Sequence, residues 1–136
     1  MVNRNYLIQP QHDSAVRAVK DIYQRHSMYA WINPNGEKNR EWCGYYIDVI
    51  AVQAREATSA WVIEIETEDS VNETEALNQW KEYDKVYTGW HLAVPTASKS
   101  EAERLIHKYG LSHCGIVTWT QNGDGTYSFW GLPGLR

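Results

Sequence analysis

The sequence lacks the features that mark membrane-spanning and disulfide-rich proteins. No stretch approaches the roughly 18 consecutive apolar residues of a membrane span. Residues 1–10 show no apolar run after a basic start, so no secretory signal is expected. The two cysteines, Cys43 and Cys114, lie far apart and show no metal-ligand spacing. We therefore expect a reduced, cytoplasmic protein with no membrane partner.

Several catalytic motifs are also missing. There is no Gly-x-Gly-x-x-Gly run and no Walker-type loop, which argues against nucleotide-driven and nicotinamide chemistry. The five histidines show no His-Glu-x-x-His spacing, and His113 beside Cys114 has no third partner in the pattern. The chain also has no excess of basic residues, because its formal net charge is -4. That charge argues against a protein that coats nucleic acid nonspecifically, but not against an enzyme whose active site is a cluster of acids.

What the chain does contain is typical of one soluble globular domain over residues 1–136. Of its 136 residues, 43% are hydrophobic and 22% are charged, and this length can bury a core without disulfide or metal staples. Seven tryptophans and nine tyrosines stand against one phenylalanine. Rings with a polar group suit half-buried surfaces, interfaces and stacking platforms, although most of these rings are expected to pack in the core.

The pattern of apolar residues, caps and turns predicts an α/β chain. The expected elements, in order, are a helix capped by Asp13 or Ser14, a turn at 33–36, strands at 43–53 and 60–67, a helix at 70–87, a strand at 90–94, a helix at 98–109 and strands at 115–120 and 126–130. Ser70 with Glu73, and Ser98 with Glu101, form capping boxes. A short link makes the first two strands an antiparallel hairpin, and Asn-Gly-Asp-Gly at 122–125 predicts a C-terminal β-hairpin.

Three acidic residues stand out on the first two predicted strands. Side chains alternate faces along a strand, so Glu64 and Glu66 project from one face. Asp48 lies in an apolar run, where a buried carboxylate is costly unless a cation, a basic side chain or a proton compensates it. Pairing of the strands would bring the three into one pocket, and Mg²⁺ or Mn²⁺ suits such all-oxygen ligands. The alternative is that Glu64 and Glu66 only form the solvent-exposed face of an amphipathic strand.

The next helix carries Gln79 and Tyr83, which are four residues apart and share a face. Gln79 can hydrogen-bond a base edge, a phosphate or a carboxylate ligand, and Tyr83 can stack or donate its hydroxyl. The alternative is that both simply flank Trp80 and Tyr87 on the helix surface.

Taken in order, the Asp48, Glu64-x-Glu66 and Gln79-x-x-x-Tyr83 motifs resemble the PD-(D/E)xK nuclease superfamily over roughly residues 12–110, including the QxxxY helix of its RecB-like members. The resemblance implies a restriction-endonuclease-like αβββαβ core, a mixed central sheet flanked by helices. It places Asp48 at the metal-binding aspartate and Glu64 at the acidic position of (D/E)xK, with Mg²⁺ or Mn²⁺ as the cofactor. Gln79 and Tyr83 take the QxxxY positions and support the site or contact the substrate.

Two positions depart from the pattern of that superfamily. Ile47 stands where the motif has proline, and Glu66 stands where it has the lysine that orients or activates the attacking water. In that position Glu66 would act as a base for the water or as a further metal ligand. Lys81 or Lys85 from the next helix would then supply the missing positive charge.

Residues outside these motifs complete the predicted site. Asp21 and Glu41 are the candidates for a further acidic group, and Lys38, Arg40 and Arg55 are candidates for phosphate contacts. The alternative for all five is ordinary solvated surface charge.

Three functions compete on these residues. The first is a metal-dependent nuclease that hydrolyses phosphodiester bonds, with DNA as the expected substrate and Asp48, Glu64 and Glu66 as catalytic residues. The second is a catalytically inactive nuclease-fold domain that binds nucleic acid or a protein partner in a restriction, repair or mobile-element system, as a homodimer or a subunit of a larger complex. The third, a glycosidase using Glu64 with another acid, has no recognisable sugar cleft to support it.

Overall fold

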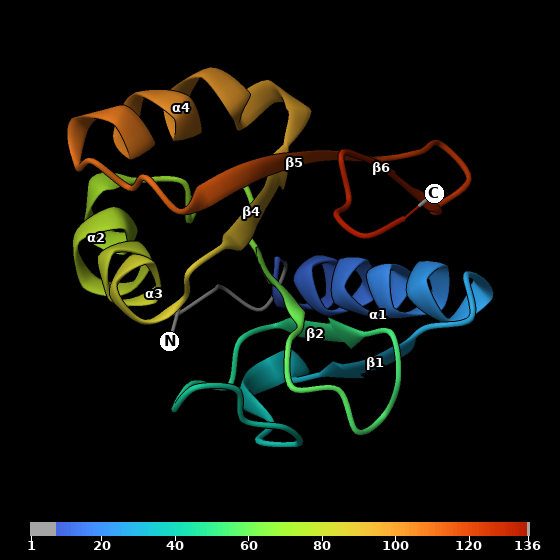
Figure 1. Ribbon diagram of the computed structural model, residues 1–136. Coiled ribbons are helices and arrows are strands. Elements are labelled where there is room, and N and C mark those ends of the chain that lie inside the picture. Colours follow the sequence, from blue (N-terminus) through green and yellow to red (C-terminus); the bar gives the residue numbers. More distant parts are fainter. Residues whose placement is uncertain (1–7, 136) are drawn as a thin grey trace.

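The computed structural model describes residues 8–135, which combine helices with one sheet (Figure 1). Residues 1–7 and residue 136 lie outside the described residues. The prediction that residues 1–10 contain no secretory signal therefore falls mostly outside them. The helices are α1 (Gln9–Arg25), η1 (Pro34–Gly36), α2 (Glu73–Glu75), η2 (Ala76–Trp80), α3 (Lys81–Val86), η3 (Thr96–Ser98) and α4 (Lys99–Lys108). The strands are β1 (Tyr29–Ile32), β2 (Val49–Val52), β3 (Trp61–Ile65), β4 (Trp90–Pro95), β5 (Cys114–Gln121) and β6 (Tyr127–Trp130). Across residues 8–135, no helix is long and apolar enough to cross a membrane.

The six strands form one mixed sheet in the order β1-β2-β3-β4-β5-β6. The first three strands are antiparallel neighbours, β3, β4 and β5 run parallel, and β6 turns back antiparallel to β5. Parallel neighbours need a crossover connection, which α2–α3 and α4 supply. The predicted α/β class, the antiparallel pairing of the two acidic strands and the C-terminal hairpin are therefore confirmed.

Helices cover both faces of the sheet. Because successive side chains of a strand point to opposite faces, Val62 packs on the side of α2, α3 and α4, whereas Ile63 and Ile65 pack on the side of α1. Figure 1 shows this arrangement, with α1 separated from the other helices by the strands. Burial of each of these aliphatic side chains contributes about 1.5–3 kcal/mol. The strand β3 is thus buried on both faces, and any polar side chain it carries must find partners inside the protein.

The strand β1 was missed by the sequence analysis, and β2 is shorter than predicted. Only three residues separate α1 from β1, and a four-residue strand carries too little alternation to be recognised. The predicted strand at 43–53 begins at Val49, because Cys43 and Gly44 have φ of 53° and 88° and turn the chain back on itself. As a result Trp42 forms a bridge with Tyr45.

None of the three predicted helix caps forms as expected. The first helix begins at Gln9, with Pro10 in its first turn, so Asp13 and Ser14 lie inside it. The side chain of Asn72, not Ser70, caps α2 by accepting a hydrogen bond from the backbone of Glu75. Ser98 precedes α4 as predicted, but its side chain makes no capping hydrogen bond because the 3-10 turn η3 leads directly into the helix.

The ring of His91 on β4 gives the stability of the fold a predicted dependence on pH. Its Nδ1 atom is buried without a hydrogen-bond partner in the described structure, and the ring lies against Gly115 so closely that a Cβ there would lie 2.8 Å from it. Burial lowers the pKa of His91 below its usual value of 6.5. Below about pH 7 the unfolded chain therefore binds more protons than the folded one, and stability falls as pH drops through that window.

We expect His91→Leu to make the free energy of unfolding depend less on pH below about pH 7. The urea midpoint of the wild type should fall between pH 7.5 and pH 5, and that of the variant should fall less. His107→Leu, at an exposed position on α4, is the matched control and should keep the wild-type profile. Parallel profiles for the wild type and His91→Leu would contradict the prediction.

Candidate functional site

A pocket of about 950 Å³ opens beside the start of α1, the loop after β1 and the helix α2–α3. Five of the residues that the sequence predicted for the site line it: Lys38, Asp48, Glu64, Gln79 and Tyr83. In the antiparallel register Val49 lies opposite Ile63, which places Asp48 opposite Glu64. The pairing of β2 with β3 thus brings the two acids together, as the sequence analysis predicted.

Asp48 is fixed at the end of β2 by three groups from different parts of the chain. Its Oδ2 atom accepts hydrogen bonds from the backbone N of Ile65 at 2.8 Å and from Nε2 of His12 at 3.0 Å. Its own backbone N donates to Oε1 of Glu64 at 3.2 Å. Both hydrogen bonds to the carboxylate use Oδ2, and Asp48 lines the pocket. The side chain is preorganised, and it is only 7% exposed.

Glu64 lies in the middle of β3, and the helix above it holds its carboxylate. The residue is 5% exposed. The groups around the Gln79 amide assign its orientation: Nε2 donates to Oε2 of Glu64 at 3.1 Å and of Glu75 at 3.2 Å, and its oxygen accepts from the Tyr83 hydroxyl at 3.1 Å. Gln79 and Tyr83 are therefore connected to Glu64, and the alternative of an exposed acidic strand face is wrong.

The π-helical segment η2 explains why Gln79 reaches the site. Residues 76–80 form one wide turn inside an otherwise α-helical stretch, and π turns of this kind are frequent at functional sites. Gln79 and Trp80, at its end, point to Glu64 and Glu66 respectively. Burial raises the pKa of the Tyr83 hydroxyl, and the charges of Glu64, Asp48 and Glu66 raise it further. The hydroxyl therefore stays protonated and can donate to Gln79.

Glu66 occupies a different environment from the other two acids. It is fully buried, and its Oε2 accepts a hydrogen bond from Nε1 of Trp80 at 3.0 Å. Its backbone is held as well, with N donating to Ala93 O and O accepting from Nε1 of Trp119. Glu66 shares the face of Glu64, as predicted, but it is not among the described residues that line the pocket.

The other predicted residues lie outside the pocket lining, among the residues from 8 to 135. Glu41 is exposed and accepts a hydrogen bond from the backbone of Gly44, and Asp21 is exposed on α1. Lys85 pairs with Glu82 at 3.1 Å on the helix surface. Lys81, Arg40 and Arg55 are also absent from the pocket lining. Lys38 is the exception, because it does line the pocket.

The sequence analysis missed two residues of the site, His12 and Asp13. Both are buried on α1, and Nδ1 of His12 lies 2.9 Å from Oδ1 of Asp13 while its Nε2 contacts Asp48. Asp13 also accepts a hydrogen bond from the backbone N of Asn35. Helical spacing was the available signal, because residues 12, 16, 19 and 23 form one stripe that faces the sheet.

The donor atoms of this pocket fit a hard divalent cation. Four acidic residues line the pocket, Asp13, Glu37, Asp48 and Glu64, and the last two are the paired acids of the sheet. Mg²⁺ commonly takes one or two carboxylates and completes its shell with water. Both ring nitrogens of His12 are engaged, with Asp13 and with Asp48, so the imidazole supports the carboxylates and is not itself a ligand. No cluster of three His, Cys, Asp or Glu side chains with metal-site spacing occurs in residues 8–135. The fit therefore rests on the two carboxylates together with water.

Comparisons with family models, curated proteins and solved structures give no match to this chain. The functional argument therefore rests on the geometry of the pocket.

Proposed function

We propose that this protein is a metal-dependent nuclease that hydrolyses phosphodiester bonds, with DNA as the substrate. The observation that carries the proposal is the pair of preorganised carboxylates, Asp48 and Glu64, opposite each other on β2 and β3 and facing one pocket. The order α1, β1, β2, β3, α2–α3, β4 supports it, because it is the order that the resemblance to PD-(D/E)xK nucleases implies.

Each residue of the pocket has a role in this proposal. Asp48 and Glu64 hold the cation, which activates water and stabilises charge on the phosphate when bound. Gln79 keeps the Glu64 carboxylate oriented, and Tyr83 keeps Gln79 oriented. His12 fixes one oxygen of Asp48 and leaves the other for the cation. Supporting groups of this kind typically change metal affinity or activity 10- to 100-fold when they are removed.

The water-activating role of Glu66 is the part of the proposal that its surroundings constrain most. Its carboxylate lies toward Trp80, so it must exchange that hydrogen bond for a water molecule before it can act as a base. Glu66 is therefore the residue to change after the two metal ligands.

The test is cleavage of labelled single- and double-stranded DNA in Mg²⁺ or Mn²⁺. We expect Asp48→Asn and Glu64→Gln each to lower the cleavage rate about 100-fold or more, since each removes a charge that binds the cation. Glu68→Gln, an exposed acid just beyond β3, is the matched control and should cut at the wild-type rate. Circular dichroism of the three variants should be measured alongside, to check that each one folds. Cleavage that survives in both pocket variants, or a wild type that cuts nothing, would refute the nuclease.

A second candidate is a nuclease-fold domain that binds nucleic acid or a protein without cutting. The observation that favours it is Glu66 in the lysine position, buried and held by Trp80. Mn²⁺ titration by calorimetry separates the two functions. The nuclease binds the cation through Asp48 and Glu64, whereas the binding domain shows weak affinity that Asp48→Asn does not change.

A further inference from the structure

We propose that a single-stranded polynucleotide reaches the pocket along a track of paired basic and aromatic side chains on the β1 side of the molecule. The track consists of three pairs: Lys38 with Tyr46, Arg40 with Trp31, and Arg55 with Tyr29. This inference rests on the proposed function for its direction, because one end of the track is the wall of the pocket.

The three pairs are defined by short distances between a cation and a ring. Lys38 Nζ lies 5.7 Å from the centre of the Tyr46 ring. The Arg40 guanidinium lies 4.4 Å from the Trp31 ring, and that of Arg55 lies 5.1 Å from the Tyr29 ring. Contacts of this type occur roughly once per 70–80 residues, so about two are expected in a chain of this size. Residues 8–135 hold four such contacts, and three of them involve β1 or the loop that follows it.

One pair lies at the pocket, and the other two involve residues of β1, the edge strand of the sheet. Lys38 and Tyr46 line the pocket beside Asp48. Arg40 is tied to the end of β1, because its backbone N donates to Oδ1 of Asn33. On β1 itself, Trp31 and Tyr29 are two residues apart and so share one face of this edge strand.

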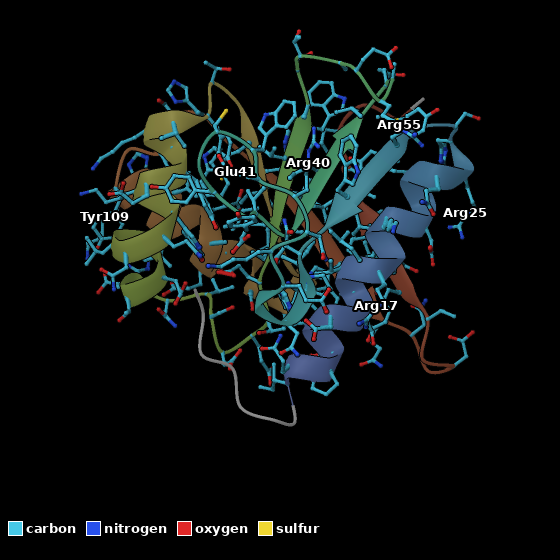
Figure 2. All side chains as sticks on the ribbon, turned by 90° about the horizontal axis from the view of Figure 1, so that it is seen from below. Arg17, Arg25, Arg40, Glu41, Arg55 and Tyr109 are labelled. Atoms are coloured by element: carbon cyan, nitrogen blue, oxygen red, sulfur yellow. The ribbon has the colours of Figure 1, made fainter. Side chains whose placement is uncertain are left out.

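Figure 2 views the molecule from below and labels Arg40 and Arg55 of the track. Tyr109 lies on the other side of this view from Arg55. The two acids of the same loop are engaged locally: Glu37 accepts a hydrogen bond from the side chain of Asn39, and Glu41 accepts one from Gly44.

The chemistry of the track selects a flexible polynucleotide whose bases are unstacked. Tyr29 and Tyr46 are 44% and 42% exposed, which leaves ring surface on which a base can stack. The three cations beside the rings are exposed and can neutralise phosphates, although the whole chain carries a formal charge of -4. In a duplex the bases are stacked on each other and cannot use the rings.

The test is fluorescence anisotropy of labelled oligothymidylate in EDTA, so that binding is measured without cleavage. We expect Tyr29→Leu to weaken binding at least about fivefold, the equivalent of losing one base stack. The double variant Arg40→Gln/Arg55→Gln should reduce the slope of log Kd against log salt by about 1.4, since each phosphate contact on a single strand contributes about 0.7. Trp31 is left unchanged because it packs against the core.

The chain offers a matched control away from the track, the pair of Lys108 with Tyr109 on α4. Tyr109→Leu, and the double variant Lys99→Gln/Lys108→Gln on α4 with the same change in charge, should keep the wild-type affinity and salt slope. Equal losses in track and control variants, tighter binding of duplex than of oligothymidylate, or no binding of oligothymidylate by the wild type would each overturn the track.

The two proposals fail in different ways. If the protein cuts DNA through Asp48 and Glu64 but the track variants bind normally, the nuclease proposal stands and the track proposal fails. If the protein binds oligothymidylate through the track but cuts nothing with any metal, the track proposal stands and the nuclease proposal fails.

Discussion

Asn33→Ala is expected to lower the free energy of unfolding by about 2–4 kcal/mol, a large effect for one polar side chain. Asn33 is buried after β1 and holds the loop that follows with four hydrogen bonds. Its Nδ2 donates to the backbone O of Arg40 and Ile47 at 2.8 and 2.7 Å. Its Oδ1 accepts from the backbone N of Asn39 and Arg40 at 2.8 and 2.9 Å. The alanine variant leaves all four backbone groups without this partner.

Chemical denaturation measures the loss, and two further variants make the result specific. Asn33→Asp keeps the acceptor but sets a carboxylate against two carbonyl oxygens, so it should be at least as destabilising as Asn33→Ala. Asn78→Ala, at an exposed position, should change stability by no more than about 0.5 kcal/mol. A stable Asn33→Asp would show that the side chain does not organise the loop. Because Asn33 and Lys38 both line the pocket, loosening this loop should also weaken ligand binding.

Trp80→Phe is the second substitution with a large expected effect, about 2–4 kcal/mol. It removes the N–H that donates to the buried carboxylate of Glu66, and it also removes volume from the core. Hydrogen bonds to a buried charge are worth more than average, because the charge is left poorly compensated when its donor is lost.

A double-mutant cycle with Glu66→Met separates the two contributions. The combined variant should be more stable than the sum of the single losses predicts, by about 1–3 kcal/mol, since removing the carboxylate relieves the penalty that Trp80→Phe creates. Trp90→Phe is the control, because the Trp90 ring donates instead to Asp84 at 2.9 Å. The losses of stability from Trp90→Phe and Glu66→Met should simply add in the double variant. Equal coupling in both cycles would mean that Trp80 contributes only volume.

The sequence predicted the main elements of the fold because they repeat clear patterns. The strand β3 alternates acidic and aliphatic residues, and the hairpin before β6 carries Asn-Gly-Asp-Gly, whose turn preference is strong. The short strand β1 and the shortened β2 depend on tertiary pairing and on left-handed residues at Cys43 and Gly44. Local sequence carries little information on either feature.

The candidate site was predictable where it depends on neighbouring strands and not where it depends on packing between distant elements. The nearness of Asp48 and Glu64 follows from the antiparallel pairing of their strands, although the exact register does not. The contact of His12 with Asp48 depends on how α1 packs across the sheet, and the pairing of Glu66 with Trp80 depends on the π turn of η2. A pattern of residue types cannot contain that information, because both contacts join segments with no fixed geometry along the chain.

The way the pocket is assembled also sets the order of events during synthesis. Its contacts join residues 36 positions apart between His12 and Asp48 and 16 apart between Asp48 and Glu64, and Gln79 and Tyr83 complete it from the next helix. Closing the chain over such separations costs conformational entropy before the contacts compensate it. A nascent chain therefore carries both acids before Gln79 and Tyr83 are synthesised, and we expect the contact that holds Glu64 to form only after α3 has packed on β3.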